Sequence, residues 1–171
     1  TAVEIIRSIP FIHPVPHRLE LIRASNQALI IDDAYSSNIE GYKAAFDFSR
    51  SLPNYPKVLV TPGLVELGKS QDLENSKMAK AASSVFDYAI VVNLENRVAL
   101  VSGFQSCGWT LYDPKRETDQ NKWSVAYQGI LKDKIVFTSD SLKEATQKVF
   151  PKVTKPNSLM LLENDLPDIY R

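Results

Sequence analysis

Short apolar segments alternate with helix-like segments along most of this chain, and this alternation constrains the fold more than any other feature of the sequence. The segments Lys57–Thr61 and Tyr88–Val92 are apolar at most positions, as expected of strands that are covered on both faces. Helices between such strands join neighbours that run in parallel. The sequence therefore predicts an α/β fold with a Rossmann-like, mostly parallel sheet flanked by helices.

The expected helices and strands follow from the apolar spacing and from the Pro, Gly and Asn residues between them. The expected strands are 19–22, 28–31, 57–61, 88–92, 134–138 and 158–162, with a turn at 25–27 between the first two. The expected helices are 38–51, 72–84, 95–107 and 141–150, with Ser139 or Asp140 as the N-cap of the last one. Segment 110–133 has no clear period, and both a β-hairpin insertion and a loop over the sheet fit it.

Charge and cysteine content exclude several classes of function. Twenty Lys and Arg residues balance twenty Asp and Glu residues, so the chain lacks the concentrated positive field that nonspecific nucleic-acid binding needs. The longest apolar runs are far shorter than the about 20 residues that cross a membrane. With one cysteine and two histidines, the chain predicts no internal disulfide and no Cys/His metal site. We therefore expect a cytoplasmic protein without a nucleic-acid or membrane partner.

The first 16 residues differ from the rest of the chain. Apolar residues at helical spacing run from Ala2 to Ile9, and Pro10, Pro14 and Pro16 then form a stiff connector. The chain begins with Thr rather than Met. These features predict that 1–16 is a hinge or the end of a preceding domain, and that 17–171 is a separate domain of a longer protein.

Residues 63–70 read GLVELGKS and match the phosphate-loop pattern G-x-x-x-x-G-K-[ST] letter for letter. In a functional loop, backbone N–H groups surround a phosphate, and Lys69 and Ser70 would make the chain a free-standing small NTPase or kinase. The residues that would surround the phosphate are bulky, however, and Glu66 would bring a carboxylate near it. This favours a strand-to-helix turn that begins at Gly63, and the nucleotide-binding interpretation stays open as the alternative.

Two segments near the start of the domain resemble a known family when they are read together. Residues 17–20 read HRLE, and residues 31–38 read IDDAYSSN. This combination resembles the start of the C-terminal domain of the Mur ligases, the ATP-dependent ligases that build the peptidoglycan stem peptide. Residues 63–68 are similar to a G-x-x-x-E-L-G turn of the same family. Near the end of the chain, 163–168 read ENDLPD where these ligases carry Lys-Gly-Ser-Arg.

The resemblance implies an enzyme that activates a carboxylate of a UDP-muramoyl peptide as an acyl phosphate and then joins it to an amino acid or dipeptide. ATP and Mg²⁺ would be held mainly by a central domain that precedes this one. The resemblance assigns Arg18 to the ATP phosphates and Asp33 to the ribose hydroxyls, and it adds Asn38 to the same site. The loop residues expected to face the incoming amine are Glu66, Asn164 and Asp165.

Each of the three ATP assignments has a purely structural alternative. Arg18 can pair with Glu20, Asp33 can cap the turn after its strand, and Asn38 is a good N-cap for the helix that follows. A binding module without ligase activity would also have this fold. The chain contains no residue that we assign to catalysis, so we expect the domain to be inactive without its neighbours.

Overall fold

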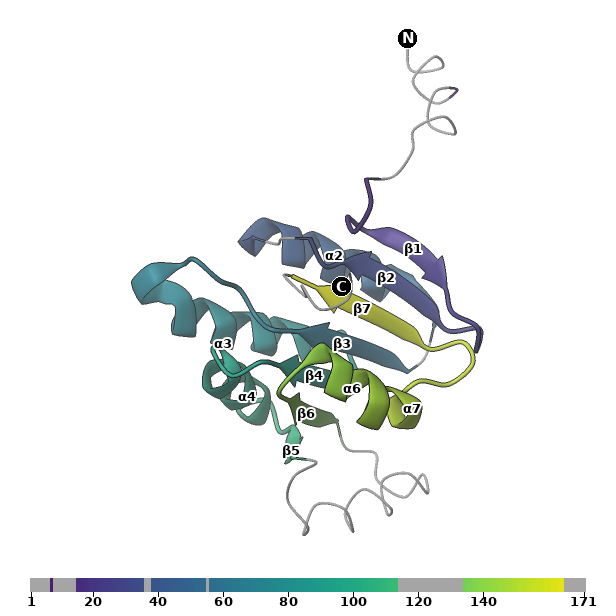
Figure 1. Cartoon of the computed structure of the whole chain (residues 1–171). Coiled ribbons are helices and arrows are strands. Elements are labelled where there is room, and N and C mark those ends of the chain that lie inside the picture. The colour runs from purple at the N-terminus through teal and green to yellow at the C-terminus, as the bar shows by residue number, and fades with distance from the viewer. Residues whose placement is uncertain (1–6, 8–14, 36–37, 55, 114–133, 165–171) are drawn as a thin grey trace.

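The computed structural model describes residues 7, 15–35, 38–54, 56–113 and 134–164. The described residues from 15 onward form a single α/β unit (Figure 1). Its strands are β1 (Glu20–Arg23), β2 (Leu29–Asp33), β3 (Lys57–Thr61), β4 (Tyr88–Val92), β5 (Thr110–Tyr112), β6 (Ile135–Ser139) and β7 (Leu159–Glu163). In the described part of the chain they make a seven-stranded sheet with the order β1-β2-β7-β3-β4-β6-β5. β1 and β2 are antiparallel and the other neighbours are parallel, which confirms the predicted α/β fold.

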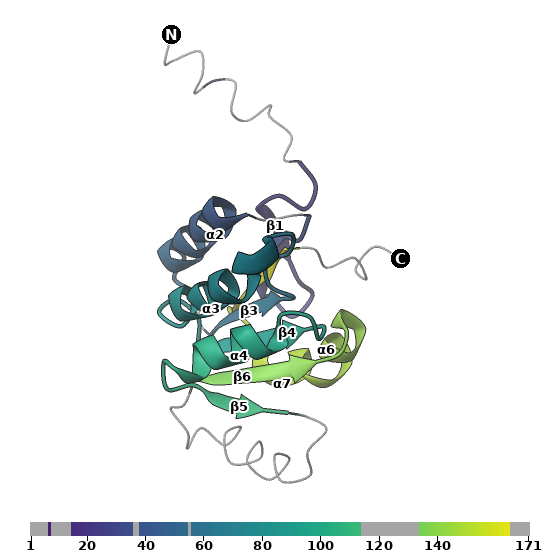
Figure 2. The same cartoon turned by 90° about the vertical axis from the view of Figure 1, so that its left-hand side faces the viewer.

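Helices cover both faces of the sheet. One face carries α2 (Ile39–Ser51), α3 (Gln71–Ala82) and α4 (Arg97–Gln105), and the other carries α6 (Leu142–Lys148) and the short α7 (Phe150–Val153), as Figure 2 shows. A 3₁₀ turn, η2 (Gly68–Ser70), leads into α3. None of the described helices is long and apolar enough to cross a bilayer.

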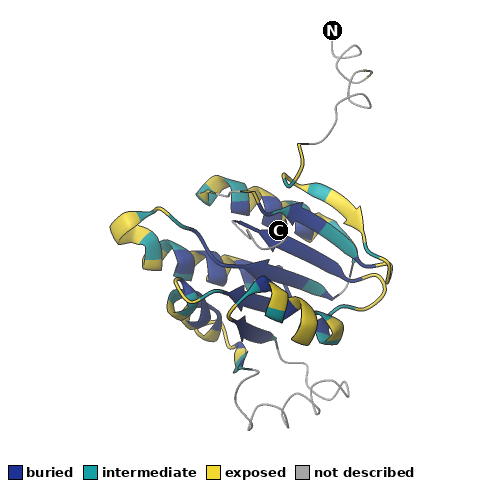
Figure 3. Ribbon diagram, viewed as in Figure 1, coloured by how far each residue is buried: buried dark blue, intermediate teal, exposed yellow. Residues whose placement is uncertain are grey.

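Each face of the sheet has its own hydrophobic core, and this explains why the central strands are apolar at consecutive positions. Side chains of a strand point alternately to the two faces. Along β3, Leu59 belongs to the core beneath α2, α3 and α4, whereas Val58 and Val60 belong to the core beneath α6 and α7. All three residues are at most 1% exposed. Figure 3 shows that the central strands are buried, whereas the edge strand β1 is mostly exposed.

The last predicted helix begins and ends differently from the prediction. Its N-cap is Ser141, whose hydroxyl accepts a hydrogen bond from the Glu144 N–H at 3.1 Å. The predicted caps are wrong, because β6 extends to Ser139 and because the Asp140 N–H donates to the Glu144 carboxylate at 3.0 Å. Pro151 lies in the first turn of α7, and the predicted helix 141–150 is divided there because proline has no N–H to continue it.

Most other predicted segments are confirmed within a few residues. The predicted turn at 25–27 joins β1 to β2, and the Gln27 N–H donates to the Ala24 carbonyl at 3.0 Å. The unassigned segment 110–133 begins with β5, which is parallel to β6 at the edge of the sheet. The remainder of that segment, 114–133, lies outside the described residues, and so does nearly all of the predicted hinge at 1–16.

The neighbouring strands β4 and β6 mark a reversal in the topology, because the connections that follow them run over opposite faces of the sheet. From β2 to β5 the crossovers run over the face that carries α2, α3 and α4, whereas the crossover from β6 to β7 runs over the other face and places β7 between β2 and β3. The loops after β4 and β6 therefore leave toward opposite faces. In open α/β sheets, ligands bind at such a reversal, outside the carboxyl ends of the strands.

Candidate site at the carboxyl edge of the sheet

The parallel strands end at one edge of the sheet, which we call the carboxyl edge. Several residues that the sequence analysis singled out lie in the loops at this edge. Asp33 ends β2, Gly63 lies just after β3, and Asn164 follows β7 directly. The loops after β4 and β6 lead to Arg97 and Asp140. The parallel topology thus brings residues that are far apart in the sequence to one side of the domain.

Arg18 and Asp33 lie together at one end of the carboxyl edge. The segment before β1 folds over the end of β2, and the Leu19 N–H donates to Asp33 Oδ1 at 3.1 Å. The Tyr35 N–H donates to the His17 carbonyl at 3.3 Å. The exposed Arg18 guanidinium lies over the Tyr35 ring, 4.6 Å from the ring centroid. The structure therefore brings together two of the three residues expected to contact ATP and leaves the guanidinium at the surface.

The half-buried Asp33 carboxyl has an altered acidity. Burial raises the pKa of Asp33, the Leu19 N–H and the Arg18 charge lower it in part, and the Asp32 charge raises it further. A partly desolvated carboxylate is a strong acceptor for hydroxyl groups, such as those of a ribose, because little water competes for it. The position of Asp33 is therefore compatible with the role that the resemblance implies.

Replacing Asp33 with asparagine is expected to raise the melting temperature of the chain at neutral pH. Asparagine keeps an oxygen for the Leu19 N–H but carries no charge that must lose its water. Because the folded state raises the pKa of Asp33, the folded chain binds more protons than the unfolded chain between the ordinary and the raised pKa. Ionised Asp33 therefore lowers stability above that range.

Calorimetric unfolding of both proteins between about pH 7 and about pH 3 tests this prediction. The gain from Asp33→Asn should shrink as the pH falls through the raised pKa of Asp33 and should vanish below the ordinary pKa. A lower melting temperature of the variant at neutral pH would show instead that attractive charges stabilise the ionised carboxylate.

Asn38 caps α2. Its side-chain oxygen accepts hydrogen bonds from the N–H groups of Glu40 and Gly41 at 3.1 and 2.8 Å. Those N–H groups belong to the first turn, where a helix offers them no internal acceptor. The structural alternative for Asn38 is therefore confirmed, and a contact between Asn38 and ATP stays a prediction.

The loop after β3 rests on buried amide side chains. Asn75 accepts from the Leu64 N–H at 2.7 Å and donates to the Leu64 carbonyl at 2.9 Å, and Asn96 donates to the same carbonyl at 3.0 Å. Asn164 donates to the Gly63 carbonyl. The three asparagines are at most 2% exposed. The sequence analysis missed this network. The signal was Asn75 itself, a polar residue on the face of α3 whose other buried residues are Met78, Ala79 and Ala82.

The residues expected to face an amine substrate are placed differently from one another. Glu66 is exposed on the loop after β3, in the left-handed conformation with a φ of 63°. Asn164 is 1% exposed, its N–H donates to the Asp33 carbonyl at 3.2 Å, and its side chain supports the loop after β3. Asp165 lies outside the described residues. Of the two described residues, Glu66 is the one whose side chain is open to a ligand.

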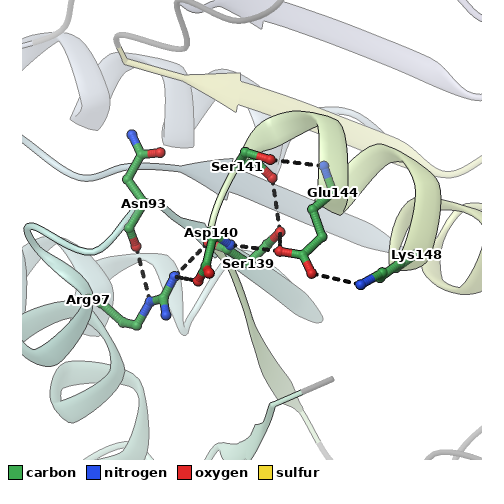
Figure 4. Close-up of polar contacts among 7 residues, drawn as sticks. All are labelled: Asn93, Arg97, Ser139, Asp140, Ser141, Glu144 and Lys148. Carbon is green, nitrogen blue, oxygen red and sulfur yellow. Dashed lines mark hydrogen bonds and ion pairs between the residues drawn. The ribbon is translucent and has the colours of Figure 1, made fainter. Parts of the chain in front are cut away.

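A second polar group lies at the reversal between β4 and β6, and the sequence analysis did not assign it (Figure 4). Arg97 donates through Nε to the Asn93 carbonyl at 3.0 Å, and through Nη2 to the Ser139 carbonyl at 2.7 Å. The same Nη2 is 3.0 Å from Asp140 Oδ1. Arg97 thereby links the end of β4 to the end of β6 by hydrogen bonds. The sequence signal that could have indicated this group is the presence of polar residues directly after the buried segment 88–92.

The surroundings of Arg97 include a charged cluster on α6 and an open hollow. The Lys148 ammonium, 2.8 Å from Glu144, lowers the pKa of that carboxyl, and the Asp140 N–H lowers it further. The hollow, about 310 Å³, lies between Arg97, Leu111 and Asp113. Because the Arg97 guanidinium is engaged by two carbonyls and by the Asp140 carboxylate, the exposed guanidinium of Arg18 is the better suited of the two to an anionic ligand.

The fold and this polar edge place the chain among open α/β domains, the class whose ligands bind at the carboxyl ends of parallel strands. No protein-family model matches the chain, and no curated protein matches it in sequence. Solved structures do match it. A MurF structure from Acinetobacter baumannii has a TM-score of 0.66 at 18% identity and covers 99% of this chain and 32% of that chain.

Two further structures extend this likeness. The MurF ligase from Thermotoga maritima, solved in complex with ADP, has a TM-score of 0.59 at 16% identity and covers 96% of this chain and 33% of that chain. A murein peptide ligase from Psychrobacter arcticus 273-4 has a TM-score of 0.55 at 11% identity and covers 94% of this chain and 29% of that chain. The chain has the fold of the C-terminal domain of Mur ligases, and it spans about one third of the length of these structures.

Proposed function

We infer that this chain is the C-terminal, substrate-binding domain of an ATP-dependent amide ligase of peptidoglycan precursor synthesis. The longer enzyme acts in the cytoplasm and adds an amino acid or dipeptide to a UDP-muramoyl peptide. Within the family, the sequence looks most like UDP-N-acetylmuramoyl-tripeptide–D-alanyl-D-alanine ligase. The observation that carries the proposal is the Arg18–Asp33 pair at the end of β2, in a domain with this fold.

The reaction needs contacts from more than one domain. ATP supplies the phosphoryl group that turns the substrate carboxylate into an acyl phosphate, and attack of the amine on that carbonyl releases inorganic phosphate. In this proposal a preceding central domain holds Mg²⁺ and makes most of the phosphate contacts. Arg18 and Asp33 complete the site from the opposite side of the cleft, where Arg18 binds phosphate oxygens and Asp33 accepts hydrogen bonds from ribose hydroxyls.

The position of Arg18 suits this role. A guanidinium is permanently charged and can bind two phosphate oxygens at once. Its contact with the Tyr35 ring is an exposed cation–π contact, which is worth only about 0.5–1 kcal/mol, so the side chain can turn toward a ligand at little cost. When the domains close, the cleft loses water and the charge of Arg18 acts more strongly on the phosphates.

The alternative function, a phosphate-loop NTPase, is not favoured by the geometry of the loop after β3. The Gly63 N–H donates to Thr61 Oγ1 at 2.9 Å, and the Leu64 N–H donates to Asn75 Oδ1 at 2.7 Å. The Leu64 side chain is buried in the core, and Lys69 is exposed in η2, the turn that precedes α3. Two of the N–H groups that would surround a phosphate therefore point into the protein.

Replacing Lys69 with alanine in the longer enzyme is expected to change turnover by less than a few-fold and to leave the affinity for ATP unchanged. The exposed ammonium group has no part in the shared ATP site that we propose. Lys80→Ala removes another exposed lysine near the other end of α3 and serves as the matched control. A hundredfold loss in Lys69→Ala alone, about 3 kcal/mol, would favour a true phosphate loop.

The proposed function is tested with the full-length protein that contains this chain. Phosphate release is measured with ATP, Mg²⁺ and UDP-muramoyl tripeptide, in the presence and absence of D-alanyl-D-alanine or single amino acids. We expect release that depends on one of these amines, together with formation of the corresponding amide product. Hydrolysis of ATP that is indifferent to every muramoyl peptide and amine would contradict the proposal.

A further inference from the structure

Three side chains near the N-terminal strand bring metal-binding atoms together. His17, Glu20 and Asp32 each offer one ligand atom within 4.8 Å of the other two. His17 Nδ1 is 2.9 Å from Asp32 Oδ2. The backbone N–H of His17 donates to Glu20 Oε2 at 3.2 Å. Asp32 is buried, whereas His17 and Glu20 are half-buried. The ligand atoms therefore meet at the boundary between the protein interior and the solvent.

The hairpin explains why these residues meet, although they are not adjacent in the sequence. Glu20 of β1 and Asp32 of β2 are direct partners in the antiparallel register, so their side chains lie on the same face of the hairpin. His17 lies three residues before Glu20 and adopts the left-handed conformation with a φ of 62°. The backbone turns there, and the ring reaches Asp32.

The charges around this cluster favour a cation. Carboxylates that lie directly opposite each other in an antiparallel pair repel, and the nearby Asp33 charge adds to that repulsion. The Arg18 charge acts on Asp33 and offsets part of this repulsion. A divalent cation between Glu20 and Asp32 would offset the repulsion between their carboxylates.

The geometry points to a binding site for a divalent first-row transition metal, of the Zn²⁺ or Mn²⁺ type, formed by His17 Nδ1 and the carboxylates of Glu20 and Asp32. With metal–ligand bonds of about 2.1 Å, neighbouring ligand atoms lie about 3.4 Å apart around a tetrahedral Zn²⁺ and about 3.0 Å apart around an octahedral ion, so the 2.9 Å between His17 Nδ1 and Asp32 Oδ2 would widen slightly for Zn²⁺. The metal takes the place of the Nδ1 proton, which moves to Nε2 of the neutral ring. An imidazole ligand disfavours Mg²⁺ and Ca²⁺.

This site is separate from the Mg²⁺ that accompanies ATP in the proposed function, and it does not depend on that function. All three ligands belong to this chain, and they lie beside Arg18 and Asp33. Metal binding would join the segment before β1 to the end of β2. Bound metal would therefore hold the loop that carries Arg18 in one conformation.

The test is calorimetric titration of the chain with Zn²⁺, Mn²⁺, Mg²⁺ and Ca²⁺, each alone. We expect one Zn²⁺ or Mn²⁺ per chain with at least micromolar affinity and much weaker binding of Mg²⁺ and Ca²⁺. His17→Gln, Glu20→Gln and Asp32→Asn should each weaken binding about tenfold or more. His13→Gln, which alters the other histidine, and Cys107→Ser, which removes the exposed thiol, are the matched controls and should have no effect.

A second readout does not depend on how the variants fold. Mn²⁺ is paramagnetic, and a small amount of it should broaden the NMR signals of the His17 ring far more than those of the Trp109 ring, which lies beside β5 at the opposite edge of the sheet. Binding that is lost in His13→Gln or Cys107→Ser but kept in Glu20→Gln would overturn the assignment. Zn²⁺ and Mn²⁺ affinities weaker than millimolar, or equal broadening of the His17 and Trp109 signals, would overturn the site itself.

Discussion

Replacing Gly63 with alanine is expected to lower the free energy of unfolding of the chain by about 2–5 kcal/mol. Gly63 has a φ of 88°, which L-amino acids rarely adopt. A Cβ at this position would overlap with Asn75 Oδ1 and lie 2.9 Å from Asn96 Cβ. Neither side chain can move aside, since both are buried and both hold Leu64 by hydrogen bonds.

Gly68→Ala is the matched control for this prediction. Gly68 also has a positive φ, 54°, but nothing lies within 4 Å of the Cβ that alanine would add. The free energy of unfolding of this variant should fall only by what the left-handed backbone costs an alanine, about 1–2 kcal/mol. Urea unfolding of the two variants separates the backbone cost from the steric overlap. Equal losses would contradict the account of a loop that rests on the asparagine network.

Replacing Arg18 with alanine in the longer ligase is expected to lower turnover tenfold or more, which corresponds to about 1.4 kcal/mol or more of transition-state stabilisation. Arg18 is exposed and contacts Tyr35, so its loss should change the stability of the isolated chain by less than about 1 kcal/mol. A residue that acts only on the ligand thus gives a large kinetic effect with a small effect on folding.

Arg23→Ala provides the matched control, because Arg23 is an exposed arginine at the other end of β1. Steady-state kinetics with varied ATP should show the loss for Arg18→Ala and wild-type values for Arg23→Ala. If both variants lose activity equally, general surface charge is responsible, and the assignment of Arg18 to the ATP phosphates is wrong.

The sequence predicted the elements of the fold well because their signals are local. The apolar segments 57–61 and 88–92 are strands in the structure with the same bounds, since burial on both faces requires an apolar residue at nearly every position. Asn38 marked the start of a helix because an N-cap acts on N–H groups only two and three residues away. The cap of α6 was predicted wrongly because three polar residues in succession, at 139–141, can each serve as a cap.

The arrangement of the strands depends on contacts that the sequence does not show. β7 lies between β2 and β3, which precede it by many residues, and no local pattern specifies that position. The Arg18–Asp33 pair was found because a family motif contains both residues. The Arg97 group was missed because Arg97 reaches Ser139, which lies 42 residues further along the chain. The Asn75 network was missed because its common partner, Leu64, lies 11 residues from Asn75 and 32 residues from Asn96.

The central claim is that the ATP site is shared between this domain and one that precedes it. Arg18 and Asp33 together contribute about 1–3 kcal/mol, which is less than the about 4 kcal/mol that corresponds to millimolar affinity. The most direct test is calorimetric titration with ATP and Mg²⁺ of this chain alone and of the full-length protein. We predict micromolar affinity for the full-length protein and affinity weaker than millimolar for the chain alone. Micromolar affinity of the chain alone would contradict the shared site and show that this domain binds ATP by itself.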